Sequence, residues 1–228
     1  MARRARLVIP GVPLHIIQRG NNRHACFLAD ADYLVYLSML QASALRANCS
    51  VHAYVLMTNH VHLLLTPETS KSPGRLMKAL GQRYVQYINR RYGRTGTLWE
   101  GRFRSCIVDD DRYFLTCQRY IELNPVRAEM VDHPRHHRWS SYRANADGVL
   151  DQLVTPHHLY MLLAQECSER RAAYRDLFED ELPSEQVEFI RRATNGNFAL
   201  GDAAFVKQAA DVLAQYVEPR LAGRPRNW

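Results

Sequence analysis

Two histidines at the start of an apolar segment are the sharpest chemical feature of this 228-residue chain. His60 and His62 flank Val61 and lead into three consecutive leucines. In a β-strand, alternate residues point to the same face, so the two imidazoles project together while Val61 enters the opposite layer. Adjacent imidazoles offer two ligands to a divalent metal, whereas ordinary hydrogen-bonded strand histidines are the alternative. The following run LLLTPE lacks the acid of an H-x-H-x-D-H motif, which disfavours a binuclear metallo-hydrolase.

Tyr120 and Asn124 form a second candidate pair. If one helix runs through both, they lie one turn apart on one face, so a phenol and an amide oxygen approach the same point. Alternatively, Asn124 precedes a proline and caps a new helix over 125–131, because a residue before proline resists helical geometry. Tyr113 shares the face of Tyr120, but only Tyr120 is followed by an amide one turn later.

Basic residues are concentrated between residues 71 and 106. This stretch holds nine Lys or Arg and one Glu, and its net charge of +8 exceeds the formal charge of +7 for the whole chain. A concentrated positive segment predicts contact with a polyanion, most often nucleic acid. The candidate DNA-binding side chains are Lys78 and Arg83 on an expected helix, Arg102 and Arg104 on an expected strand, and Arg3 and Arg4, with Arg6, in an N-terminal arm. For each single arginine, the alternative is a solvated surface charge.

Composition excludes several classes of protein. Hydrophobic residues make up 46% of the chain and charged residues 23%, which is typical of a globular protein rather than a disordered one. Five cysteines without a C-x-x-C pair disfavour a disulfide framework and a zinc ribbon. Prolines interrupt the apolar run near the N terminus, which argues against a signal peptide, and no segment approaches the roughly 18 apolar residues of a membrane span. We therefore expect a cytoplasmic protein without a membrane partner.

Alternation and helical periodicity predict the elements that position these residues. The expected strands are 14–19, 51–57, 60–66 and 98–108, and the expected helices are 31–47, 75–92 and 112–123. This order predicts an α+β fold with a ferredoxin-like or RRM-like antiparallel sheet and helices on one face. We expect this domain to span residues 1–147 and an all-helical C-terminal extension with a basic tail to span residues 148–228.

Four motifs together resemble those of the HUH single-tyrosine transposases. They are the strand HVHLLL, the helix end YIELNPVRA, the preceding RTGTLWEGRFRS and the following RWSSYR. Within that superfamily the sequence is most similar to the REP-associated tyrosine transposases, and the resemblance covers about residues 1–147.

The resemblance implies a metal-dependent single-stranded DNA endonuclease and strand transferase that acts on hairpin-forming repeats. It implies that Tyr120 is the nucleophile that forms a 5′-phosphotyrosine. It further implies that His60, His62 and Asn124 hold a divalent metal ion, Mg²⁺ or Mn²⁺. The implied partner is single-stranded or hairpin DNA, which predicts association with the nucleoid, while monomer and homodimer are both open.

Two other functions fit the same residues. A catalytically silent DNA- or RNA-binding protein could use the same sheet, and an H-x-H metallo-hydrolase is a third hypothesis. A covalent protein–DNA adduct that depends on Tyr120 would separate the first function from the second. Cleavage of small phosphoesters without DNA would indicate the hydrolase.

Overall fold

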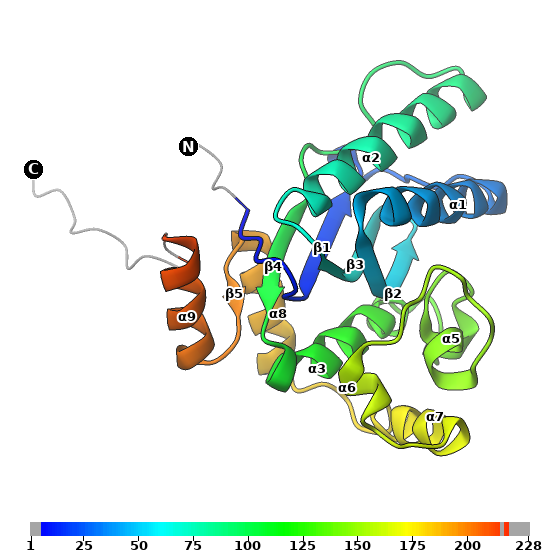
Figure 1. The fold of residues 1–228 in the computed structure, drawn as a ribbon. Helices are drawn as coiled ribbons and strands as arrows, with labels where there is room; N and C mark the ends of the chain where they lie inside the picture. Colours follow the sequence, from blue (N-terminus) through cyan, green and yellow to red (C-terminus); the bar gives the residue numbers. More distant parts are fainter. Residues whose placement is uncertain (1–5, 215–216, 219–228) are drawn as a thin grey trace, which may run out of the picture.

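Five strands form one sheet in the order β2-β3-β1-β4-β5 (Figure 1). The computed structural model describes residues 6–214 and 217–218, and its strands are β1 (Leu14–Arg19), β2 (Cys49–Met57), β3 (His60–Pro67), β4 (Arg104–Val108) and β5 (Ala199–Leu200). β1 pairs antiparallel with β3 and β4, β2 pairs antiparallel with β3, and β5 runs parallel to β4. The first four strands make the predicted ferredoxin-like sheet, and the two-residue β5 extends it.

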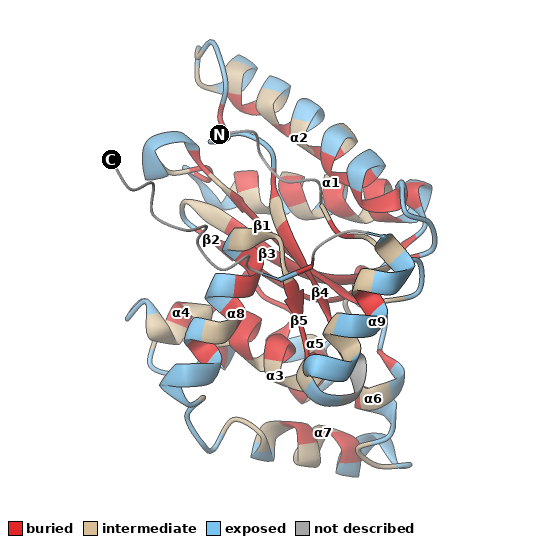
Figure 2. Cartoon of the chain, turned by 90° about the vertical axis from the view of Figure 1, so that its left-hand side faces the viewer, coloured by how far each residue is buried: buried red, intermediate tan, exposed pale blue. Residues whose placement is uncertain are grey.

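Helices cover both faces of the sheet, and the buried residues lie between the layers (Figures 1 and 2). The two crossover helices, α1 (Asp30–Ala47) and α2 (Ser72–Arg91), lie together on one face, as the sequence predicts. On the opposite face lie α3 (Asp110–Glu122) and α8 (Ser184–Gly196). The expectation of helices on one face therefore describes the crossover helices, whereas α3 and α8 add a second layer.

Strand alternation explains why both faces are covered. Leu63 of β3 packs in the core beneath α1 and α2, whereas Leu64 packs in the core against α3 and α8. A strand that is apolar on both sides needs an apolar partner on each. The second core draws on the predicted stripe of α3, with Phe114, Cys117 and Ile121, and on Ile190 of α8.

The remaining helices belong mostly to the C-terminal part of the chain. They are α4 (Asn124–Arg127), α5 (Tyr142–Asp147), α6 (His158–Met161), α7 (Cys167–Asp176) and α9 (Ala203–Leu213), with single 3₁₀ turns at Asn21–Arg23 and Pro134–His136. A small core of tyrosines joins α5, α6 and α7. The extension is helical as predicted, apart from β5, and no helix in the described part of the chain is long and apolar enough to cross a membrane.

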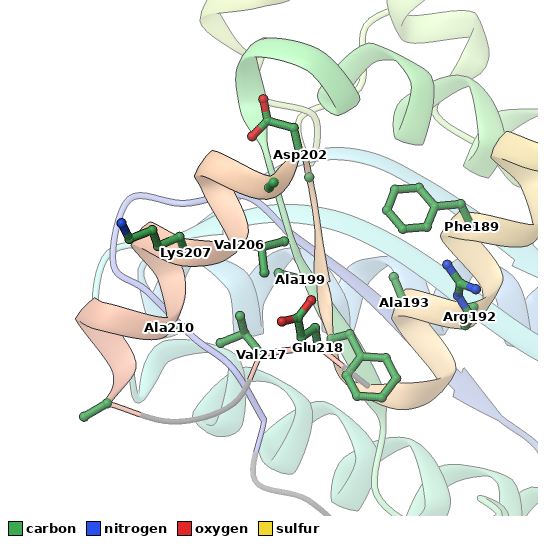
Figure 3. Close-up of a pocket in the computed structure, with 14 residues that line it drawn as sticks. Phe189, Arg192, Ala193, Ala199, Asp202, Val206, Lys207, Ala210, Val217 and Glu218 are labelled. Carbon is green, nitrogen blue, oxygen red and sulfur yellow. The ribbon is translucent and has the colours of Figure 1, made fainter. Parts of the chain in front are cut away.

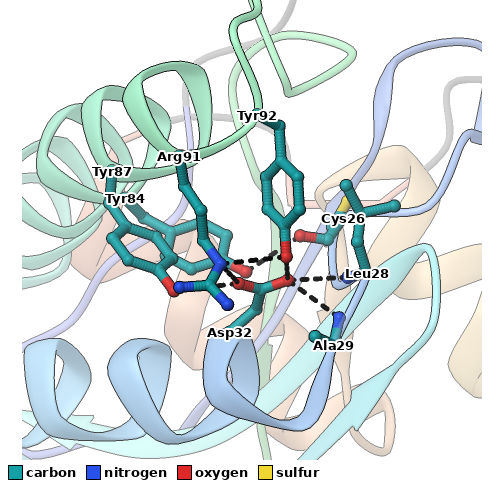
Figure 4. Close-up of polar contacts among 8 residues, drawn as sticks. All are labelled: Cys26, Leu28, Ala29, Asp32, Tyr84, Tyr87, Arg91 and Tyr92. Carbon is teal, nitrogen blue, oxygen red and sulfur yellow. Dashed lines mark hydrogen bonds and ion pairs between the residues drawn. The ribbon is translucent and has the colours of Figure 1, made fainter.

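A buried carboxylate fixes α1 against the end of α2 (Figure 4). Both oxygens of Asp32 are used: one accepts from the backbone N–H groups of Leu28 and Ala29 and from the Tyr92 hydroxyl, and the other accepts from the Tyr87 hydroxyl. Burial acts to raise the pKa of Asp32, but these hydrogen bonds outweigh it and hold the pKa below the ordinary value. The predicted helix start at Asp30 and Asp32 is thus reinforced by contacts from a second helix.

Two predicted elements are shorter than expected. The strand predicted over 98–108 begins only at Arg104, because Gly101 adopts φ +147° and interrupts the extended backbone, and Trp99 forms an isolated bridge with Gly20. The helix predicted over 125–131 ends at Arg127, because Glu129 adopts a left-handed φ of +54°.

Candidate active site

His60 and His62 point to the same face of β3, as their spacing predicts. Their ring centroids are 5.1 Å apart, and His62 is 2% exposed. Burial lowers the pKa of His60 to about 4, with help from the charge of Arg19, and lowers the pKa of His62 well below its ordinary value. Both imidazoles are therefore neutral near pH 7, which is the form that binds metals.

Hydrogen bonds occupy the Nδ1 atom of each histidine. His60 Nδ1 lies 2.6 Å from Asn59 Oδ1, and His62 Nδ1 lies 2.8 Å from Nε2 of His15, a buried residue on β1. An imidazole held through Nδ1 has Nε2 available as a ligand atom. In both residues, therefore, Nε2 is the nitrogen available to bind a ligand.

Tyr120 approaches this pair from α3. Its ring centroid lies 5.9 Å from that of His62 and 5.8 Å from that of His15, in edge-on contacts. Tyr120 is 4% exposed, and burial raises the pKa of its hydroxyl. The positive charges of Arg127 and Arg191, and a hydrogen bond from Arg191, act in the opposite direction and favour the phenolate.

Asn124 does not cap a new helix with its side chain. Its Nδ2 instead donates backwards to the carbonyls of Tyr120, at 3.0 Å, and Ile121, at 3.2 Å. Pro125 has no N–H to donate to the Ile121 carbonyl four residues earlier, and the Asn124 amide supplies a donor in its place. Because the nitrogen faces the backbone, the amide oxygen of Asn124 is the atom left for a ligand.

The end of α3 is held by a buried acid. Glu122 accepts hydrogen bonds from Ser141 at 2.6 Å, Asn145 at 2.9 Å and Tyr174 at 2.7 Å. Burial raises the pKa of Glu122 to about 7, although the three donors lower it. These contacts anchor the last turn of α3, which carries Tyr120. They join it to Ser141, which precedes α5, and to α5 and α7.

Two arginines beside Tyr120 are absent from the sequence predictions. The Arg127 guanidinium lies over the Tyr120 ring, 4.3 Å from its centroid, and donates to the Tyr120 carbonyl. Its Nε and Nη1 are buried without a hydrogen-bond partner among the described residues. Arg191 comes from α8, about 70 residues away in sequence, and no local spacing signals it. Arg127 had one usable signal, since it lies one turn after Asn124.

These side chains surround one hollow of about 270 Å³. It is lined by His60, His62, Tyr120, Asn124, Arg19, Arg127, Arg191, Thr194, Asn195, Ile17, Met57 and Ala128. The structure therefore brings together all four residues predicted as nucleophile and metal ligands. It also adds residues from β1 and α8.

A basic groove continues from this hollow. The next hollow shares Ile17, Arg19 and Asn195 with the first, and a third shares Arg102, Arg104 and Asn195 with the second. We call the three together the arginine groove. Two of its arginines, Arg102 and Arg104, are among the predicted DNA-binding residues.

The other predicted basic residues lie elsewhere. Lys78 and Arg83 are exposed on α2, on the opposite face of the sheet, so the structure does not bring them to the arginine groove. Lys78 and Arg83 remain predicted DNA contacts, but they lie on a different surface from Tyr120. Arg3 and Arg4 fall outside the described residues.

The donor set suits a metal of intermediate hardness. Within residues 6–214 and 217–218, no three His, Cys, Asp or Glu side chains form a metal site. The available atoms are instead two imidazole nitrogens and one amide oxygen, which leaves further coordination positions for other oxygen ligands. Such a mixed set suits Mn²⁺ well, and Mg²⁺ less well because Mg²⁺ prefers oxygen ligands.

A larger hollow, of about 1020 Å³, lies between α8 and α9 (Figure 3). Apolar side chains such as Val206, Ala210 and Val217 line it together with Arg192 and Lys207. Its described lining contains neither tyrosine nor histidine. The candidate nucleophile and metal ligands lie instead in the smaller hollow at Tyr120.

Comparisons with known proteins bear on the family and the fold of this chain. A family model described as "Transposase IS200 like" matches residues 9–124. The solved structure of a REP-associated tyrosine transposase bound to a REP hairpin is 18% identical, with a TM-score of 0.52, and covers 69% of this chain and 93% of that one. A candidate transposase from Deinococcus radiodurans R1 is 20% identical, with a TM-score of 0.36, and covers 57% and 92%. No curated protein matches the sequence. The first of these structures supports the fold.

Proposed function

The chain belongs to the IS200-like transposase family, and from this premise we propose that it is a metal-dependent single-stranded DNA endonuclease and strand transferase. The observation that carries the proposal is a single hollow lined by Tyr120, His60, His62 and Asn124 together with arginines that include Arg127 and Arg191. A nucleophile, a metal-binding set and anion-binding groups in one hollow are what phosphodiester transfer requires.

Tyr120 is the proposed nucleophile. Its hydroxyl oxygen attacks the phosphorus of a single strand, the bond from phosphorus to the 3′ oxygen breaks, and the phenol proton ends on that 3′ oxygen. The products are a 5′-phosphotyrosine and a free 3′-OH. The reverse reaction with another 3′-OH reseals the strand and restores Tyr120, so strand transfer needs no further reactant.

His60, His62 and Asn124 would hold the metal, Mn²⁺ or Mg²⁺. A bound divalent ion supplies Lewis-acid polarisation of the scissile phosphate and stabilises charge on the departing oxygen. The edge-on contacts of Tyr120 with His62 and His15 fix the ring beside these ligands.

Arg127 and Arg191 are the proposed phosphate-binding groups. A phosphate in the hollow would supply the acceptors that Arg127 Nε and Nη1 lack among the described residues. Guanidinium forms paired hydrogen bonds with phosphate oxygens, and desolvated pairs of this kind are strong. The same two charges lie beside the hydroxyl that must become a phenolate.

The arginine groove is the proposed path of the DNA strand. Arg19 lines the Tyr120 hollow and the next one, and Arg102 and Arg104 line the second and third hollows. Glu100 offsets Arg104 only weakly, because the ion pair is long, at 3.9 Å, and the two side chains are 42% and 47% exposed. The neighbour bound to a REP hairpin supports a hairpin-forming repeat as the substrate class.

Adduct formation tests this function. Labelled hairpin-flanked single strands from the region around the gene are incubated with the protein and Mn²⁺ or Mg²⁺ and separated on a denaturing gel. We expect a covalent adduct that Tyr120→Phe abolishes and Tyr113→Phe retains, because Tyr113 lies on the same helix and packs on Phe189 instead of lining the hollow.

Three other outcomes would contradict the proposal. Equal cleavage by wild type and Tyr120→Phe would rule out this nucleophile. DNA binding without adduct or cleavage on any such substrate would favour the silent binding protein. Cleavage of small phosphoesters without DNA would favour a hydrolase.

A further inference from the structure

A chain of hydrogen bonds leads from α8 to the ligand His62. Thr194 Oγ1 lies 2.9 Å from His15 Nδ1, and His15 Nε2 lies 2.8 Å from His62 Nδ1. His15, His62 and Thr194 are 1%, 2% and 3% exposed, so water does not compete for these bonds. The chain joins β1, β3 and the C-terminal extension on one face of the sheet.

The partners of Thr194 set the direction of every bond in this chain. Its hydroxyl donates to the Ile190 carbonyl at 2.8 Å, one turn earlier in α8. A hydroxyl has one proton, so towards His15 it is an acceptor, and His15 must donate from Nδ1. The second lone pair of Thr194 Oγ1 is left for the Cys106 thiol, whose sulfur lies 3.3 Å away. The oxygen then donates one hydrogen bond and accepts two, which is all that a hydroxyl can form.

The direction continues to the metal-binding nitrogen. A neutral His15 that carries its proton on Nδ1 has a lone pair on Nε2, so it accepts from His62 Nδ1. His62 then carries its only proton on Nδ1 and has a lone pair on Nε2. The opposite direction would place a proton on His62 Nε2, and a protonated nitrogen cannot bind a metal.

We propose that Thr194 and His15 are positioning residues that fix His62 in the tautomer able to bind a metal through Nε2. The inference rests on the proposed metal-dependent function, but the tautomer itself is a property of the metal-free protein. It gives α8 a role in ordering a metal ligand on β3.

The tautomers can be measured in the metal-free protein with ¹⁵N-labelled histidine and long-range ¹H–¹⁵N correlation spectra. In the wild type we expect both His15 and His62 to carry the proton on Nδ1. Thr194→Val removes the acceptor for His15 with little change in volume, and we expect a shift of His62 towards the Nε2 proton. Thr194→Ser keeps the hydroxyl and should restore the wild-type pattern.

Mn²⁺ affinity gives a second readout that does not depend on DNA. Loss of an outer-shell partner typically weakens metal binding about 10- to 100-fold, and we expect this rise in Kd for Thr194→Val and near wild-type binding for Thr194→Ser. Thr66→Val is the matched control, because Thr66 Oγ1 lies 2.9 Å from Nε2 of the buried His52, away from the hollow.

Two results would overturn the proposal. One is a wild-type His62 that carries its proton on Nε2, which needs no variant and so does not depend on whether Thr194→Val folds. The other is a Kd in Thr194→Val within about twofold of wild type or of Thr66→Val. If the wild type forms no Tyr120 adduct while the tautomers are as expected, the proposed function fails and the positioning role stands.

Discussion

Replacement of Arg127 by methionine should separate stability from activity. Burial lowers the pKa of Arg127 to about 10, from an ordinary 12.5, even with Tyr120 acting to raise it. A shift of this size means that the folded protein disfavours the charged side chain by about 3 kcal/mol. Methionine of similar length avoids this penalty but loses the contact with the Tyr120 ring and one hydrogen bond, together about 1–3 kcal/mol.

We therefore expect Arg127→Met to have a free energy of unfolding between that of wild type and about 2 kcal/mol above it. Adduct formation with DNA should fall about 10²- to 10³-fold, the usual cost of one donor to a developing charge. Urea unfolding measures the first quantity, and single-turnover adduct formation measures the second.

Arg119→Met is the matched control for this experiment. Arg119 adjoins Tyr120 in sequence and also has a buried, unpartnered Nε among the described contacts, but its Nη2 donates to the Asp180 carbonyl. Its loss should leave adduct formation unchanged. The proposed role of Arg127 is refuted if Arg127→Met has a free energy of unfolding several kcal/mol below that of wild type and still forms the adduct at the wild-type rate, because Arg127 would then be a structural residue.

Two further predictions concern the scaffold. Asp32→Ala should lower the free energy of unfolding in urea by about 3–5 kcal/mol, because two backbone N–H groups and two tyrosine hydroxyls lose their acceptor, and Asp32→Asn should cost about half as much; equal losses would contradict the role of the charge. Burial lowers the pKa of His52 to about 4, so the unfolded chain binds a proton below pH 6.5 that the folded chain binds only near pH 4. The contribution of His52 is thus fully present above pH 6.5, and about 3 kcal/mol of it is lost as the pH falls to 4. His52→Gln should flatten the dependence of stability on pH across this window, and an unchanged slope would refute the assignment.

Sequence reasoning found the parts of the site that depend on short-range spacing. His60 and His62 share a face because strand side chains alternate, and Tyr120 and Asn124 meet because they lie one helical turn apart. The orientation of the Asn124 amide could not be predicted in the same way. Its nitrogen donates to the Ile121 carbonyl because Pro125 has no N–H to donate to that carbonyl.

The rest of the site depends on contacts between distant segments. His15 lies opposite Leu64 on β3, a register set by the whole sheet, and Arg191 and Thr194 reach the hollow only because α8 packs on β4 and β1. No local periodicity encodes such contacts. The proposed boundary at residue 147 marks the end of the recognisable motifs, although α8 beyond it packs against the same sheet.

The parallel pairing of β5 with β4 determines how late in synthesis the sheet can be completed. Ile107 pairs with Ala199 across about 90 residues of sequence, and contacts of such long range form late. A nascent chain that ends before α8 already contains Tyr120, His60 and His62, but it has neither Arg191 nor Thr194. During synthesis, therefore, the proposed nucleophile emerges from the ribosome before Arg191 and Thr194, and a prematurely terminated chain would lack part of the candidate active site.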